Sequence, residues 1–74
     1  MIEELDAVVL TRDLPEEQLA VGDVGTVVLV HGGGAGYEVE FTTLTGDTVA
    51  VIILDASSVR AVKGHEIAHV RAVG

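Results

Sequence analysis

Residues 21–41 read VGDVGTVVLVHGGGAGYEVEF and contain, in order, a bend, a strand, a hairpin connection and a second strand. Two glycines around an aspartate, at residues 22–25, are typical of a tight bend, and the apolar run 26–30 follows it directly. Residues 31–36, HGGGAG, predict a flexible hairpin tip. The segment after it alternates apolar and acidic residues. Its two faces carry Tyr37, Val39 and Phe41, and Glu38 and Glu40.

The same pattern of short predicted strands separated by turn signals extends in both directions from this hairpin. Residues 5–11 predict a first strand, and residues 12–19 predict a long loop in which Pro15, followed by two glutamates, begins a helical turn. Residues 48–54 predict a fourth strand. Residues 55–58 predict a 3₁₀ turn, and residues 59–62 predict a fifth strand. Five strands with a long first loop and a short fourth turn are the order of an SH3-like barrel.

The length and composition limit the chain to one small all-β domain. It has 74 residues, of which 49% are hydrophobic and only 3% aromatic, so the core is aliphatic, and β-branched side chains favour strands. We expect residues 1–62 to form the barrel. Residues 63–74 form a C-terminal tail that either stays irregular or adds a further strand, on its own barrel or on a neighbour. The absence of cysteine excludes disulfides and thiolate metal sites and agrees with a cytoplasmic location.

The charge distribution is the main guide to partners. Twelve acidic residues against four basic ones, a formal net charge of −8, argue against nucleic acid, because phosphate binding needs clustered lysine and arginine. No apolar stretch is long enough for a membrane anchor. Residues 1–55 hold eleven of the acids and one base, whereas residues 56–74 hold three bases and one acid. This asymmetry predicts that the tail docks on an acidic barrel face, in its own protomer or in another.

Self-association is predicted from the strands at 26–30 and 48–54, which are apolar on both faces. A small barrel has one interior, so the outer faces of these strands need a cover. The tail or a second copy of the chain can supply it, and we therefore expect a homo-oligomer. The residues predicted to assemble through the tail are Ile67, His69, Val70 and Arg71.

A family resemblance is carried by residues 2–11 (IEELDAVVLT), 13–15 (DLP), 22–28 (GDVGTVV), 37–41 (YEVEF) and 66–71 (EIAHVR). Together these segments resemble the bacterial domain-of-unknown-function family four-nine-two-six over nearly the whole chain. The Gly-Asp-x-Gly-Thr-Val element is also similar to the start of the second strand in KOW and other SH3-like barrels. The resemblance implies a stand-alone barrel without an established activity or functional residues. It also implies a co-encoded partner, as in a toxin–antitoxin pair.

The segment His65-Glu66-Ile67-Ala68-His69 matches the H-E-x-x-H pattern of zinc proteases. Such a site requires a long packed helix, a third ligand and a substrate cleft, and the chain offers no ligand downstream and little room for a cleft. The segment reads equally well as a strand with solvated imidazoles. Metal binding by His65 and His69 therefore stays an alternative function, that of a metal-binding accessory protein, and no cofactor is expected.

The remaining signals favour a protein-interaction module over an enzyme. His31-Gly32-Gly33-Gly34 resembles an oxyanion-hole element, but no nucleophile elbow accompanies it. The acids Asp13, Glu16 and Glu17 lie in the first loop, where SH3-like barrels usually make contacts, and we expect them to dock a basic partner protein. The sequence predicts a small acidic module that associates with itself or with a co-encoded protein.

Overall fold

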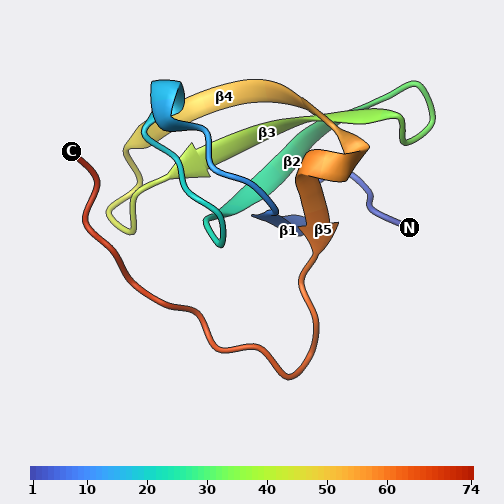
Figure 1. The fold of residues 1–74 in the computed structure, drawn as a ribbon. Helices are drawn as coiled ribbons and strands as arrows, with labels where there is room; N and C mark the ends of the chain where they lie inside the picture. The colour runs from blue at the N-terminus through green and yellow to red at the C-terminus, as the bar shows by residue number, and fades with distance from the viewer.

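The computed structural model describes residues 1–74 and contains a single five-stranded antiparallel sheet with the strand order β4-β3-β2-β1-β5 (Figure 1). The strands are β1 (Ala7–Leu10), β2 (Val24–His31), β3 (Gly36–Thr42), β4 (Thr48–Asp55) and β5 (Val59–Ala61). Two short 3₁₀ turns, η1 (Pro15–Glu17) and η2 (Ala56–Ser58), interrupt the loops where helical turns were predicted. The all-β prediction is confirmed, and the long β1–β2 loop and single turn between β4 and β5 agree with an SH3-like barrel.

The core lies on the face of the sheet that carries Tyr37, Val39 and Phe41 of β3. All three predicted core residues of β3 are at most 6% exposed. Residues from every other strand and from the β1–β2 loop complete the cluster. Its members are Val8, Leu10, Leu14, Leu19, Val27, Tyr37, Val39, Phe41, Ala50, Leu54 and Val59. The core is aliphatic apart from its two aromatic rings, as the composition predicted.

A bulge in β2 explains how the run of apolar residues at 26–30 serves both faces of the sheet. Val27 pairs with Val39, but the next pair is Leu29 with Glu38, so Val28 is the extra residue. Because paired residues in an antiparallel sheet point to the same side, Val27 faces the core with Val39. Leu29 faces outward with Glu38.

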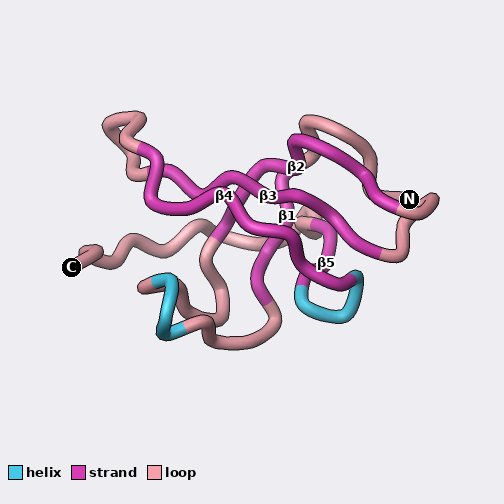
Figure 2. Tube along the Cα trace, turned by 90° about the horizontal axis from the view of Figure 1, so that it is seen from above, coloured by secondary structure: helices cyan, strands magenta, loops and turns pink.

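Residues 62–74, which include the C-terminal tail (63–74), contain no helix or strand. This segment leaves the end of β5, runs away from the barrel and returns toward the far side of the molecule, so that the C-terminus lies well away from β5 (Figure 1). Figure 2 shows the tail in the loop colour along its whole length. Of the two predicted alternatives, this protomer therefore has the irregular tail. The chain also has no helix that is long and apolar enough to span a membrane.

Candidate functional site

The outer face of the sheet, defined by Val28, Leu29, Glu38, Glu40, Val51 and Ile53, exposes apolar side chains around two acids. The strand register places Glu38 between Leu29 and Ile53, and places Glu40 between Thr26 and Val51. Ile53 is 67% exposed, Val51 49% and Leu29 42%. This arrangement gives a surface with an acidic central strand and apolar strands on both sides.

The two acids of the outer face are each approached by one side chain. The Thr48 hydroxyl donates a 2.9 Å hydrogen bond to Glu40 Oε2. His31 Nε2 lies 3.8 Å from Glu38 Oε1. This nitrogen atom is buried and has no hydrogen-bond partner. Neither glutamate forms an ion pair with a lysine or arginine. The predicted solvent face of β3 is confirmed, with both carboxylates on one side.

The open edge of the sheet beside this face is β4, which pairs only with β3. Its residues from Thr48 to Leu54 include no charge, proline or glycine. The opposite edge, β5, has three residues and carries Arg60. Natural proteins protect edge strands by making them short or by placing charges or proline on them. By this criterion β5 is protected and β4 is not, so β4 is the edge on which another strand can form hydrogen bonds.

Each of the three arginines interacts with one acidic residue, and only two of these acids, Asp23 and Asp55, belong to residues 1–55. Arg12 Nε donates to Ser58 Oγ at 2.8 Å, and its charge contributes to the lowered pKa of Asp55. Arg60 forms a two-point contact with Glu66, with donor–acceptor distances of 3.0 and 2.5 Å. Arg71 binds Asp23. The acids of the outer face and of the first loop lie outside these pairs, so the free surface is acidic.

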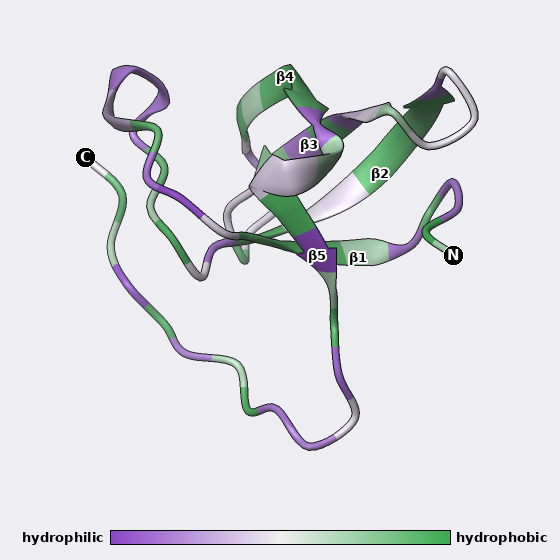
Figure 3. Ribbon diagram, turned by 45° about the vertical axis from the view of Figure 1, so that its right-hand side comes forward, coloured by the Kyte–Doolittle hydropathy of each residue, from purple (hydrophilic) through white to green (hydrophobic).

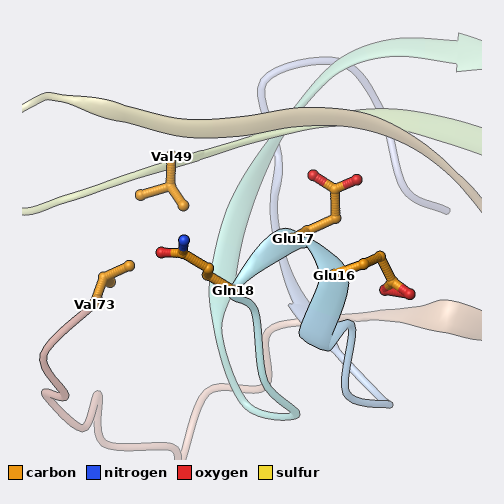
Figure 4. Close-up of a pocket in the computed structure, with 5 residues that line it drawn as sticks. All are labelled: Glu16, Glu17, Gln18, Val49 and Val73. Atoms are coloured by element: carbon orange, nitrogen blue, oxygen red, sulfur yellow. The ribbon is translucent and has the colours of Figure 1, made fainter.

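The first-loop acids predicted to dock a partner do not form one cluster. Asp13 Oδ1 accepts the Val21 N–H at 2.8 Å and so joins the two ends of the loop. Glu16 and Glu17 lie on η1 and line a shallow pocket with Gln18, Val49 and Val73. Figure 4 shows Gln18 reaching toward the two valines, whereas the glutamate carboxylates point away from them. The structure therefore gives Asp13 a role in shaping the loop and leaves the two glutamates near solvent.

The tail residues predicted to mediate assembly lie in different environments. Ile67 is 95% exposed and Val70 is 73% exposed. His69 and Arg71 line a groove between the tail and the barrel. Within the chain, Arg71 binds Asp23 and donates to the Gln18 carbonyl. Figure 3 shows apolar and polar residues following one another along the tail.

The two histidines of the H-E-x-x-H pattern lie in this irregular tail and not on a helix. Both residues are exposed, and Glu66 between them is bound by Arg60 and by the backbone N–H of Lys63. The protein contains no group of three or more histidine, cysteine or acidic residues placed to hold a metal ion. The arrangement that a zinc protease requires is absent from this segment.

Two features of the site were not predicted from the sequence. The bulge at Val28, which turns Leu29 outward, has no polar residue or glycine beside it to indicate a change of register. The pairing of Arg71 with Asp23 joins residues 48 positions apart. The charge asymmetry indicated that the tail would dock on acids, but it did not identify which acid.

The comparisons with known proteins assign the chain to a family. The family model described as Domain of unknown function (DUF4926) matches residues 4–61, and the chain therefore belongs to this family. The match runs from before β1 to the last residue of β5 and leaves out the tail. No curated protein and no solved structure matches the chain.

Proposed function

We propose that this protein is a non-catalytic protein-interaction module that binds through the outer face and the adjoining edge of β4. The observation that carries the proposal is the exposure of Leu29, Val51 and Ile53 around Glu38 and Glu40, beside an uncharged open strand. Exposed apolar side chains grouped on one face of a small protein are typical of interaction sites. The tail does not cover them, because it docks at Asp23.

The partner that best fits this surface is a basic protein. Alternating lysine or arginine and apolar residues on a partner strand would meet the acids of β3 and the apolar residues of β4. Strand addition of this kind uses backbone hydrogen bonds for affinity and side chains for specificity, and opposite charge accelerates the encounter. A co-encoded basic protein, held in an antitoxin-like complex, would have this chemistry.

Self-association through the same edge is the second candidate. The uncharged residues 48–54 let two copies approach without placing acids directly opposite each other. Two β4 strands can pair antiparallel about a two-fold axis, and such an interface is self-complementary. Both candidates use the same face, so one set of variants tests them.

The experiment compares the wild-type chain with Ile53→Lys and with the control Ile67→Lys, whose isoleucine lies in the tail and is 95% exposed. Light scattering after gel filtration gives the mass of each chain alone and mixed with the protein encoded beside it. We expect a complex, with itself or with the neighbour, that Ile53→Lys abolishes and Ile67→Lys preserves. A wild-type chain that is monomeric and does not bind its neighbour would contradict the proposal. An unaffected Ile53→Lys complex would exclude this face.

A further inference from the structure

Two ion pairs attach the tail to the barrel: Arg60 of β5 binds Glu66 near the start of the tail, and Arg71 binds Asp23 near its end. Arg71 Nε donates to Asp23 Oδ1 at 2.8 Å, and its Nη2 donates to Asp23 Oδ2 and, at 3.0 Å, to the Gln18 carbonyl. Two parallel hydrogen bonds between a guanidinium and a carboxylate give geometric specificity as well as attraction. Three acceptors thus surround the guanidinium in an arrangement that an ammonium group would not fill.

The acceptors are held in place by the barrel independently of the tail. Asp23 Oδ2 accepts the Ala20 N–H at 2.8 Å, and the Asp23 carbonyl accepts the N–H of Leu10 in β1 at 2.9 Å. Gln18 has a left-handed backbone conformation at the end of η1, with φ near 60°. Its N–H donates to the Pro15 carbonyl. The site is therefore formed before an arginine binds, which lowers the cost of binding.

The groove beside this arginine site is only partly filled by the tail. It has a volume of about 460 Å³, and its barrel wall includes Leu19, Val24, Phe41 and Val49. Val70 precedes Arg71 but is 73% exposed, and the residue after Arg71 is the small Ala72. Leu19 and Phe41 are buried at the base of the groove, whereas Val24 is 50% exposed, so the tail satisfies the carboxylate and leaves open space beside Val24.

We propose that Asp23, the Gln18 carbonyl and this groove form a binding site for an arginine within an extended segment of a partner protein, and that the tail occupies it as an intramolecular substitute. The carboxylate specifies arginine, and the open space beside the exposed Val24 favours a partner with a larger aliphatic residue next to that arginine. This site is separate from the outer face, so it does not depend on the function proposed above. A tethered tail competes with any external segment because its effective concentration is high.

The test is an NMR titration of the ¹⁵N-labelled full chain, as wild type and as Arg71→Ala, with a synthetic peptide of residues 68–74, AHVRAVG. A second peptide carries Ala72→Leu, and a third carries Arg71→Gln. We expect the amides of Leu19, Asp23 and Val24 to shift in the Arg71→Ala chain, with about tenfold tighter binding than in wild type because the competitor is removed. The Ala72→Leu peptide binds more tightly, and the Arg71→Gln peptide does not bind.

The control adds Asp23→Asn to the Arg71→Ala chain. Asparagine keeps an oxygen for the Ala20 N–H, so the loop is preserved, and the loss of the charge abolishes peptide binding. Unchanged sheet amides show that each variant is folded. Equal peptide affinity for wild type and Arg71→Ala, or binding that survives Asp23→Asn, overturns the proposal. A wild-type dimer that Arg71→Ala dissociates would show a second copy's tail in the groove and would also overturn it.

Discussion

Gly25 of β2 lies so close to Val39 of β3 that a Cβ atom at position 25 would be 2.5 Å from Val39 Cγ1. The same atom would be 2.8 Å from the Phe41 ring and 3.0 Å from the Glu40 carbonyl. Gly25, the second glycine of the Gly-Asp-x-Gly element, therefore allows β2 to approach the core side chains of β3. Its function is close packing, since its φ is not positive.

The first prediction is that Gly25→Ala destabilises the fold. Overpacking a filled core typically costs about 1–3 kcal/mol, and here the obstacle includes backbone. Urea unfolding followed by circular dichroism measures the free energy of unfolding. Gly64→Ala is the control, because nothing lies within 4 Å of a Cβ there and φ is not positive. Equal stability of the two variants would show that β2 and β3 move apart without cost.

Ser58 lies in η2, between the edge strands β4 and β5, and its hydroxyl contacts Arg12 of the first loop. Its removal should weaken the fold. It is 1% exposed, its Oγ accepts a hydrogen bond from Arg12 Nε at 2.8 Å, and it donates to Asp55 Oδ1. We expect Ser58→Ala to lower the free energy of unfolding by about 1 kcal/mol, a typical net value for a hydrogen bond. The neighbouring Ser57→Ala is the control, since Ser57 is exposed and donates only to Asp55.

The same variant has a signature in pH. The hydrogen bond from Ser58 is the main cause that lowers the pKa of Asp55 below its usual 3.8. A lowered folded-state pKa gives stability that is present above pH 3.8 and is lost as pH falls through the folded value. In Ser58→Ala the pKa of Asp55 should rise toward 3.8, and this contribution should shrink. An Asp55 carboxyl shift that titrates identically in both chains would contradict the assignment.

The course of the polypeptide was largely predictable because its determinants are local. Alternation in β3, glycine-rich turns, Pro15 before two glutamates and the Asp55–Ser58 turn each define one element within a few residues. The tail has no such pattern, and its path depends on the contact of Arg71 with Asp23. The charge asymmetry indicated that the tail would dock on acidic residues, but it could not identify Asp23, because that residue is 48 positions away in the sequence.

The outer face was predictable only in part, for a related reason. The two-sided apolar character of β4 showed that Val51 and Ile53 needed a cover, and both are exposed. The outward position of Leu29 depends on the bulge at Val28, which forms from the pairing of β2 with β3. Such a register shift depends on long-range pairing and not on the run of valines itself.

The turn at the start of the tail should persist in acid. Arg60, with help from the Lys63 backbone N–H, lowers the pKa of Glu66 from 4.5 to about 2. Its contribution is therefore complete above pH 4.5 and is lost as pH falls toward 2. The Glu66 side-chain carboxyl shift, followed by NMR, should titrate near 2, and the amide of Ile67 should become mobile over the same range. In Arg60→Gln the pKa of Glu66 should rise toward 4.5, with the Lys63 N–H still lowering it; a wild-type titration near 4.5 would show that the Arg60–Glu66 contact is not populated.

Deleting residues 63–74 should leave the barrel folded. The tail adds no strand and forms no backbone–backbone hydrogen bond with the barrel, and the family match ends at residue 61. Its ion pairs are at the surface, where such pairs contribute little to stability. A chain ending at Val62 should therefore give a dispersed amide spectrum and unfold cooperatively, with local shifts near Asp23. An unfolded or insoluble chain would show that the tail is needed to cover Phe41 and its neighbours.

Zinc should not bind specifically to His65 and His69. Two histidines four residues apart chelate a metal when a helix places both on one face, and here the segment is irregular and follows Gly64. Forming a helix would break the contact between Arg60 and Glu66, and isolated short helices are unstable in water. Equimolar zinc should leave both imidazole resonances in place, and His69→Ala should not change the response. Saturable binding at equimolar zinc that His69→Ala abolishes would contradict this prediction and would support the accessory metal-binding function.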